Sequence, residues 1–404
     1  MRLCYLWFIL SAILLTSVQT MANPVAALPK EPKVVLVSID GLRWQEVFYG
    51  ADTQIASNSQ YVRNRRDIAH FLTGARAREL MPFFHHIIAK QGILVGDRHQ
   101  NSLMNVTNPW HISYPGYNEM LSGRADPKLH SNAKIPNPNI TVLEWLSKQQ
   151  GMQGKVAAFG SWEVLPYILN VERSGLPVNA GFAEAPEPLT PKLKLLNQLQ
   201  RQTPSPWSAV RLDVFTHQFA LEYLQHQKPR LLYVAYGETD DFAHDRRYDQ
   251  YLAAAHRTDS FIAQLWQQLQ ADPYYRDQTT LLITTDHGRG NQSSNWSMHA
   301  GARALERQLT GYLKPLAKHG QGIAGSDEIW FAAIGPSIPA QGLVKTNTPW
   351  LQSQVASTIA ELLGFDFQSF QYQASQALPL QQLHPEQMLA SSKPDQQLTA
   401  QVAP

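Results

Sequence analysis

Short apolar runs alternate along this chain with longer segments of helical periodicity, and this alternation restricts the fold more than any other feature. Strands that are apolar throughout must be covered on both faces. The pattern therefore predicts an α/β fold with a mostly parallel central sheet and helices on both of its faces. The strands expected from it cover 33–40, 155–162, 230–238, 279–285 and 328–336, and the helices cover 81–92, 140–151, 212–227, 248–270 and 352–363.

The N-terminus has the character of an export signal. Arg2 precedes the apolar run Leu3–Leu15, which is shorter than the roughly 18 residues that span a bilayer. Thr20 and Ala22 then supply small residues suited to a signal-peptidase site. We expect a cleaved signal peptide over 1–22 and a mature chain, periplasmic or secreted, without a membrane span. The short run disfavours the alternative, an uncleaved anchor.

The rest of the chain is long enough for one large catalytic domain. The sequence has 404 residues, of which 44% are hydrophobic, and its formal charge of +2 gives no indication of a nucleic-acid-binding surface. We expect the domain over 23–374 and a polar, flexible tail over 375–404. The only cysteine, Cys4, leaves with the signal peptide, so neither a disulfide nor thiol chemistry is expected.

Three of the expected strands are followed by residues that bind metals. The strand 33–40 ends at Asp40, the strand 230–238 is followed by Asp240 and His244, and the strand 279–285 is followed by Asp286 and His287. Each alone has a simpler explanation, such as a helix cap, an Asx-turn or a solvated pair. Together they meet at one edge of a parallel sheet, where ligand sites gather. Carboxylates combined with imidazoles favour zinc or manganese over calcium.

A hydrolase built around metals also needs a nucleophile, and Ser113 is the candidate. Pro115 and the residues after it have the character of a helix start, so Ser113 is expected near a helix N-terminus, where free amides attract anions. The alternatives are that Ser113 is only a helix cap, or that the nearby hydroxyl of Thr107 is the nucleophile.

The motifs together resemble the alkaline phosphatase superfamily, in particular its nucleotide pyrophosphatase/phosphodiesterase-like branch. "VSIDGLRW", "SYPGYNEMLSG", "TDDFAH" and "TTDHGRG" match its motifs in order over roughly 35–340. The resemblance implies an alkaline phosphatase-like fold with two divalent metal ions, zinc by preference and manganese as the alternative. It also implies the ligands: Asp40, Asp286 and His287 with Ser113 at one ion, and Asp240, His244 and a later histidine at the other.

The resemblance has two local consequences around the strand ends and the nucleophile. The strand must break at Asp286-His287 for both side chains to reach one metal, and Gly288 permits this break. Ser113 lies ten residues before Gly123, as in the family, which favours it over Thr107.

The nucleophile motif departs from its relatives at two positions. The phosphodiesterase-like pattern has Asn where this chain has Gly116, and Asn118 is out of register with it. Formylglycine sulfatases have Arg where this chain has Tyr117, which argues against a sulfatase of that kind.

Two histidines compete to complete the second metal site. His299 follows Trp296 in "NWSMHAG", and His319 stands in "KHGQGIAGSDEIW". In relatives of this branch the ligand is followed by Gly and soon by a Gly-Ser/Ala-x-Glu-Ile-Trp stretch. Only His319 has that context, so we predict His319 as the ligand and the segment before it as an insertion.

The predicted activity is hydrolysis of small-molecule phosphate mono- or diesters through a phosphoserine. Arg43, Asn118, Arg124 and Arg289 are candidates for holding substrate oxygens, although each arginine also has a structural explanation. Other open functions are a phosphomutase-like enzyme, a sulfate- or phosphonate-ester hydrolase of the same superfamily, and a non-catalytic periplasmic binding protein braced by metals.

Overall fold

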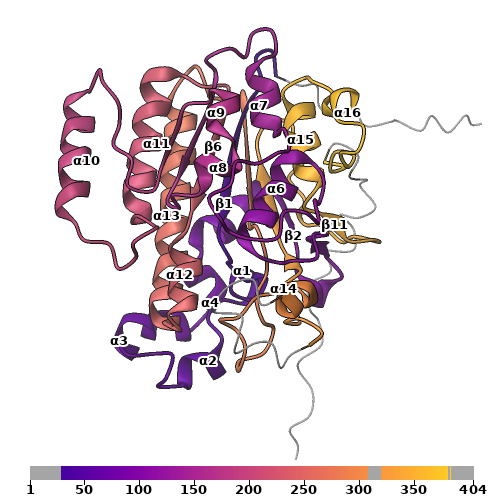
Figure 1. Ribbon diagram of the computed structural model, residues 1–404. Helices are drawn as coiled ribbons and strands as arrows, with labels where there is room; N and C mark the ends of the chain where they lie inside the picture. The colour runs from indigo at the N-terminus through magenta and orange to yellow at the C-terminus, as the bar shows by residue number, and fades with distance from the viewer. Residues whose placement is uncertain (1–28, 308–319, 381–382, 384–404) are drawn as a thin grey trace, which may run out of the picture.

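The computed structural model describes residues 29–307, 320–380 and 383 (Figure 1). The predicted signal peptide and most of the predicted tail lie outside these residues. The strands are β1 Lys33–Ile39, β2 Gly92–Val95, β3 Met104–Asn105, β4 Val156–Gly160, β5 Val178–Ala180, β6 Leu231–Tyr236, β7 Thr279–Thr284, β8 Glu328–Ile329, β9 Phe331–Ile334, β10 Gly342–Leu343 and β11 Trp350–Leu351.

Helices connect and cover these strands. They are α1 Trp44–Tyr49, α2 Thr53–Ser57, α3 Arg65–Ile68, α4 Arg76–Leu80, α5 Ala89–Gln91, α6 Ser113–Ser122, α7 Val142–Ser147, α8 Leu165–Ile168, α9 Val171–Ser174, α10 Pro191–Gln202, α11 Asp213–Gln227, α12 Glu238–His244, α13 Tyr248–Ala271, α14 Ala302–Arg307, α15 Gln354–Leu362 and α16 Phe367–Phe370, with shorter turns η1 Ala69–Leu72, η2 Phe84–Ile88 and η3 Arg98–Gln100.

The central sheet has eight strands in the order β10-β2-β9-β7-β1-β6-β4-β5. Its pairs are parallel except those of β9, which runs antiparallel to both β2 and β7. β1 lies between β6 and β7, so these three parallel strands end side by side at one edge. The predicted α/β class with a mostly parallel sheet is therefore confirmed.

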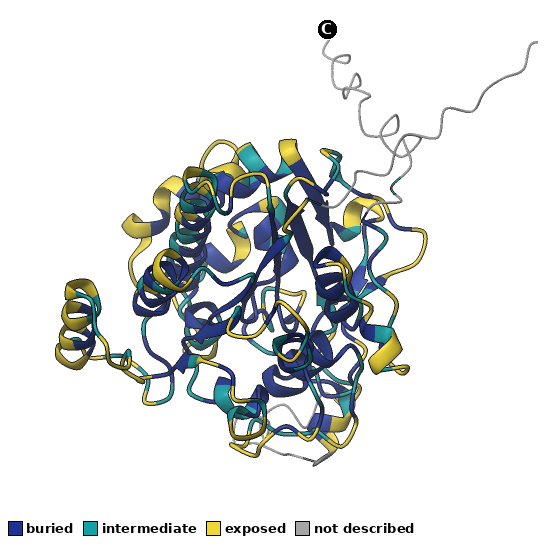
Figure 2. Ribbon diagram, turned by 90° about the horizontal axis from the view of Figure 1, so that it is seen from above, coloured by how far each residue is buried: buried dark blue, intermediate teal, exposed yellow. Residues whose placement is uncertain are grey.

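Alternate residues of β1 enter two separate cores, one on each face of the sheet. Val35 and Val37 pack with the helices α11 and α13, whereas Val34 and Leu36 pack with α6, α7 and α15. Figure 1 shows α11 and α13 on one side of the sheet and α7 and α15 on the other. In Figure 2 the central strands β1, β6 and β7 are dark blue, and exposed residues lie on the outer helices and loops. Because both faces of the sheet are covered, as predicted, its central strands are apolar throughout.

The expected helix 81–92 is helical over 82–91, with the π-helical turn η2 in its middle, and the Asp259 carboxylate accepts the amides of Phe83 and Phe84 near its start. Another expected element differs from the prediction. The expected strand 328–336 is divided into β8 and β9 at Trp330. The carbonyl of Trp330 accepts a hydrogen bond of 2.6 Å from the Thr284 hydroxyl, so β8 turns into a second sheet, β11-β3-β8.

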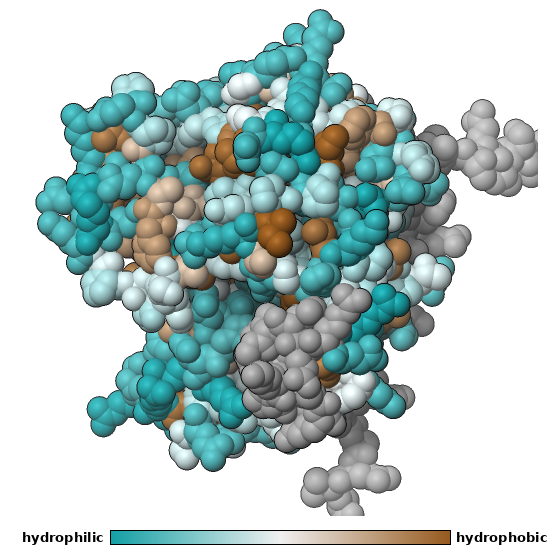
Figure 3. Space-filling view, viewed as in Figure 1, coloured by the Kyte–Doolittle hydropathy of each residue, from teal (hydrophilic) through white to brown (hydrophobic). Residues whose placement is uncertain are grey.

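None of the described helices is long and apolar enough to cross a bilayer. On the face in Figure 3, strongly hydrophobic residues form small separate patches among hydrophilic ones.

Packing continues past residue 374, where the tail was predicted to begin. The amide of Ser375 donates to the carbonyl of Gly123, and the amide of Leu378 donates to the hydroxyl of Thr358 at 2.8 Å. The side chains of Leu378 and Leu380 are buried in the core beside α15. The folded unit therefore includes residues up to Leu380.

We predict that Leu378→Ala lowers the free energy of unfolding by about 2–4 kcal/mol, because it leaves a cavity in a packed core. Tyr372→Ala, at a neighbouring side chain that is 82% exposed, is the matched control and should change it by less than about 0.5 kcal/mol. Urea denaturation of both variants measures the difference, and equal effects would contradict the assignment of Leu378 to the core.

Candidate metal centre

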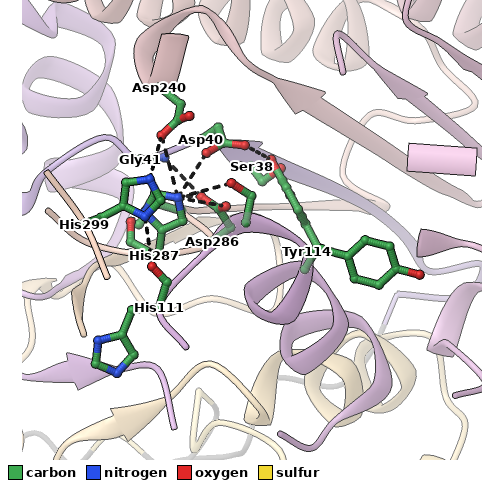
Figure 4. Close-up of polar contacts among 12 residues, drawn as sticks. Ser38, Asp40, Gly41, His111, Tyr114, Asp240, Asp286, His287 and His299 are labelled. Atoms are coloured by element: carbon green, nitrogen blue, oxygen red, sulfur yellow. Dashed lines mark hydrogen bonds and ion pairs between the residues drawn. The ribbon is translucent and has the colours of Figure 1, made fainter. Parts of the chain in front are cut away.

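The three parallel strands β1, β6 and β7 deliver five potential ligands to one edge of the sheet (Figure 4). Asp40 follows β1 directly, and Asp286 and His287 follow β7. After β6 the chain enters α12, whose length places Asp240 and His244 one turn apart on the same helix face. The structure thus brings together all five of these predicted ligands.

Asp40, Asp286 and His287 form one group of potential ligands. Their donor atoms lie within 4.8 Å of one another, and Nε2 of His287 is 3.4 Å from Oδ1 of Asp40 and 3.5 Å from Oδ2 of Asp286. The other oxygen of each carboxylate is held by the protein. The hydroxyl of Tyr117 donates to Oδ2 of Asp40 at 2.9 Å, and the amide of Gly41 donates to Oδ1 of Asp286 at 3.1 Å.

One oxygen of each of these buried carboxylates is left without a hydrogen bond. These are Oδ1 of Asp40 and Oδ2 of Asp286, both inaccessible to solvent. Burial, with the charge of Asp286, raises the pKa of Asp40 to about 8, and burial raises the pKa of Asp286 to about 7. Buried carboxylates are strongly disfavoured as anions unless a cation or donors compensate them. The unpaired oxygens therefore fit a divalent cation bound by one oxygen from each residue.

The ring of His287 is also oriented to bind a divalent cation. Its Nδ1 lies 2.9 Å from the carbonyl of Gly288 and donates to it, which leaves the lone pair of Nε2 directed at the two carboxylates. Burial lowers the pKa of His287, so the neutral form that binds metals is favoured. A Cβ at position 288 would lie 2.3 Å from the carbonyl oxygens of Gly325 and Glu328. Gly288 is therefore required by this close approach.

Asp240 and His299 form the second group together with His287, and His244 lies beside them. Nε2 of His244 is 3.1 Å from Oδ2 of Asp240 and 3.2 Å from Nε2 of His299. The ring of His299 stacks on that of His287 with centroids 3.8 Å apart, and its Nε2 is 3.8 Å from Oδ1 of Asp240. Nδ1 of His299 donates to the carbonyl of His111 at 2.8 Å, so its Nε2 is also free of a proton.

The structure brings His299 to this centre, and His319 as the ligand stays a prediction. His299 lies in the centre, whereas His319 lies outside the described residues. The sequence feature that could have pointed to His299 is Trp296, three residues before it. The ring of Trp296 is fully buried against Tyr248 and Tyr251. A core anchor at this distance holds the chain rigidly, so His299 is fixed and is not at the base of a surface excursion.

Ser113 lies beside the first group. It is the first residue of α6, and its Oγ is 3.3 Å from Nε2 of His287. The competing hydroxyl of Thr107 instead donates to the buried carboxylate of Glu119 at 2.7 Å. The structure therefore brings Ser113 to the metal ligands and gives Thr107 a structural role.

The departure at Gly116 also has a geometric cause. A Cβ at this position would lie 2.2 Å from the carbonyl oxygen of Asp286. Close packing of α6 against the chain at Asp286 thus excludes Asn, and with it every other side chain, from position 116. Asn118 does not take its place, because its side-chain oxygen accepts from the amides of Asn137 and Asn139.

The arginines proposed to hold substrate are bound to protein groups. Arg43 is buried and pairs with Glu46, and its Nη1 donates to the carbonyl of Gly290 at 2.9 Å. Arg289 donates to the carbonyls of Gly41 and Ser297 and pairs with Asp240. Arg124 donates to the side chain of Asn139. In these contacts, as in those of Asn118, the side chains bind other groups of the protein, which is the structural explanation considered for the arginines.

One residue that the sequence did not single out is bound next to Ser113, the predicted nucleophile. Oδ1 of Asn132 accepts a hydrogen bond of 3.0 Å from the amide of Tyr114, the residue after Ser113. The loop 124–139 therefore returns to the N-terminus of α6. Its polar character alone could not reveal this position.

Comparisons with known proteins agree with this geometry. The family described as type I phosphodiesterase / nucleotide pyrophosphatase matches residues 123–311, just under half of the chain. No curated protein matches the chain.

Solved structures share the fold at low sequence identity. A putative sulfatase from Bacteroides thetaiotaomicron is 13% identical with a TM-score of 0.52, over 89% of this chain and 75% of that one. Alkaline phosphatase PafA is 10% identical with a TM-score of 0.51, over 84% and 97% respectively. The lipoteichoic acid synthase LtaP from Listeria monocytogenes is 10% identical with a TM-score of 0.50, over 87% and 76%. The predicted alkaline phosphatase-like fold is therefore confirmed, and the match of residues 123–311 agrees with the predicted resemblance to phosphodiesterases.

We predict that His299→Ala lowers the bound metal by about one ion per chain, because it removes an imidazole donor from a site with few others. His319→Ala is the matched control and should leave the metal content unchanged. Elemental analysis after gel filtration measures both. Loss of metal in His319→Ala with full content in His299→Ala would restore the assignment made on sequence.

Proposed function

We propose that this chain is an exported two-metal hydrolase that cleaves phosphodiesters through a phosphoserine on Ser113. The observation that carries the proposal is the position of the Ser113 hydroxyl, at the N-terminus of α6 and 3.3 Å from His287, beside the unpaired oxygens of Asp40 and Asp286. A hydrolase that uses bound metals requires this juxtaposition of nucleophile and anionic ligands.

The ligand sets follow from the two groups of donors. Asp40, Asp286 and His287 would hold one ion next to Ser113, and Asp240, His244 and His299 would hold the other; the chemistry favours zinc, with manganese as the alternative. When bound, such ions lower the pKa of a coordinated hydroxyl and stabilise negative charge on the attacking and leaving oxygens.

The chain's own groups provide the rest of the reaction. Oγ of Ser113 attacks the phosphorus and forms a new oxygen–phosphorus bond. The bond between the phosphorus and the departing alcohol breaks, and the oxygen of that alcohol takes up a proton. Water then cleaves the phosphoserine and regenerates the hydroxyl. The amides at the start of α6 face the phosphoryl group with the positive end of the helix dipole. Asn132, held at the amide of Tyr114, is placed to donate its own amide hydrogens to a phosphoryl oxygen.

Charge favours a diester over a monoester. Arg43 and Arg289 are paired with Glu46 and Asp240, and Arg124 is bound to Asn139. These three arginines therefore do not neutralise a second charged oxygen of the substrate phosphate. A phosphodiester carries one negative charge, whereas a monoester carries nearly two at neutral pH. The description of the family matched by residues 123–311 supports the same choice.

The other functions have less support. Tyr117 stands where formylglycine sulfatases have Arg, and its hydroxyl is bound to Asp40. A binding protein braced by metals would not require a serine hydroxyl beside them. Export to the periplasm or outside the cell rests on the sequence of residues 1–22 alone, and it disfavours a phosphomutase that acts on cytoplasmic substrates.

We predict that Ser113→Ala lowers turnover of an aryl phosphodiester at least about 1,000-fold, because it removes the hydroxyl that lies 3.3 Å from Nε2 of His287 at the start of α6. Metal content should remain close to that of the wild type. Thr107→Val, which removes the competing hydroxyl, is the control and should retain most of the activity. Assays of zinc-loaded protein with paired aryl mono- and diesters measure both effects, and full activity in Ser113→Ala would refute the mechanism.

A further inference from the structure

A cavity of about 350 Å³ lies between the helices α10 and α11 and the strands β4 and β5 at one end of the sheet. Its inner wall is formed by the buried rings of Phe159 and Phe219 and by the ring of Tyr223, whose centroid is 5.3 Å from that of Phe159. Figure 1 shows α10 as the outermost helix on this side, beside α11. Ligand pockets in proteins are mostly apolar and have volumes of about 300–1,000 Å³. This cavity is therefore large enough for a small molecule.

The outer wall of the cavity is held in place by polar side chains of α10. Oδ1 of Asn197 accepts from the amide of Ala185 at 2.9 Å, and Nδ2 of Asn197 donates to the carbonyl of Ala185 at 3.1 Å. Nε2 of Gln200 donates to the carbonyl of Phe182 at 3.0 Å. Both of these α10 side chains are buried, so they fix the loop 181–190 against the helix. Because residues of this loop line the cavity, its outer wall is a fixed part of the fold.

The cavity is separate from the candidate metal centre. α11 begins at Asp213, whose carboxylate accepts from the amide of Gly237 at the start of α12, whereas the residues of α11 that line the cavity lie on its later turns. The distance along the helix axis from Asp213 to Glu222 is about 14 Å at 1.5 Å per residue. None of the described potential metal ligands lines the cavity. A molecule bound here is therefore not the one whose phosphate the metal centre would bind.

Glu222 gives the cavity a negative charge. Its side chain is 5% exposed, and Oε1 accepts from the hydroxyl of Thr190 at 2.6 Å and lies 3.2 Å from Nε2 of His226. Its Oε2 is 3.5 Å from Nζ of Lys192, whose side chain is 42% exposed. An ion pair with an exposed lysine stabilises a protein little, so a ligand cation can replace it. The described residues that line the cavity include two carboxylates, Glu187 and Glu222, and neither lysine nor arginine.

We propose that this cavity binds a hydrophobic amine, with an aromatic body between the rings and a protonated amine at Glu222. A cavity of about 150 Å³ holds benzene, so about 350 Å³ accommodates a body of two fused rings. Aromatic rings pack favourably against such walls, and the faces of phenyl and phenol rings attract cations. The two carboxylates disfavour an anionic ligand of the same shape. This binding function is independent of the proposed phosphodiester reaction.

The test compares three naphthyl compounds of similar shape and different charge. At pH 7 naphthylethylamine is a cation, naphthylethanol is neutral and naphthylacetate is an anion. We expect zinc-loaded wild-type protein to bind the amine at least about tenfold more tightly than the alcohol by calorimetry, because a hydrogen bond between charged groups is stronger than one to a neutral group. Naphthylacetate should bind most weakly of the three.

Substitutions then locate the bound amine. Glu222→Gln keeps an oxygen for the hydroxyl of Thr190 but removes the charge, so it should abolish the preference and leave binding of the alcohol within about twofold of the wild type. Ala185→Phe should weaken binding of the amine and the alcohol by about tenfold, because a larger side chain fills the cavity that Ala185 lines. Glu184→Gln is the matched control, since Glu184 pairs with Arg201 and does not line the cavity. It should keep the wild-type affinities.

Four results would each refute the site. They are no saturable binding of the amine, equal affinity of the wild type for the amine and the alcohol, a preference that persists in Glu222→Gln, and unchanged binding in folded Ala185→Phe. If Ala185→Phe does not fold, Glu222→Gln alone decides. Calorimetry with these compounds needs no turnover, so failure of the proposed hydrolysis would leave the result intact.

Discussion

Asp40 and Asp286 are buried carboxylates at the ends of neighbouring strands, and each keeps one oxygen without a hydrogen bond. Such groups are costly in a protein interior unless a cation compensates them. The surrounding contacts fix the second oxygen of each residue, through Tyr117 and the amide of Gly41. The fold therefore accepts a local instability in order to hold two oxygens at a defined position.

The arrangement of the sheet makes this position possible. β1 lies between β6 and β7, so its two neighbours bring the ligands on α12 and after β7 to the end of the same strand. Backbone carbonyls then set the histidines, since Gly288 accepts from His287 and His111 accepts from His299. Close packing at Gly116 brings α6, and with it Ser113, against the chain at Asp286. Each of these contacts fixes the position of a potential ligand or of Ser113, in addition to any contribution to the stability of the fold.

The fold class and the meeting of five potential ligands could be predicted from the sequence because both depend on local patterns. Apolar runs mark the strands, and the residue after a strand end lies at a known edge of the sheet. His299 could not be chosen in this way, since its position depends on the anchoring of Trp296 in a distant core. The residues around it favoured His319, which lies outside the described residues. Measurement of bound metal in the two variants, and not the sequence pattern, therefore decides between the two histidines.

Side-chain partners over long separations were equally beyond the sequence. Arg43 and Arg289 stand beside catalytic motifs, but their guanidinium groups meet Glu46 and the carbonyls of Gly290, Gly41 and Ser297. Asn132 looked like an ordinary loop residue until the fold brought its side chain to the amide of Tyr114, next to Ser113. Local patterns thus predicted which potential ligands meet at the strand ends, whereas side-chain partners depend on loop paths that such patterns do not specify.

The central claim is that two metal ions bind at the carboxyl edge of this sheet. Anomalous X-ray scattering at the zinc edge from crystals of the zinc-loaded protein tests it most directly. The account predicts two peaks about 4 Å apart, one bound by Asp40, Asp286 and His287 and the other by Asp240, His244 and His299. A single peak, or peaks that avoid these residues, would contradict it.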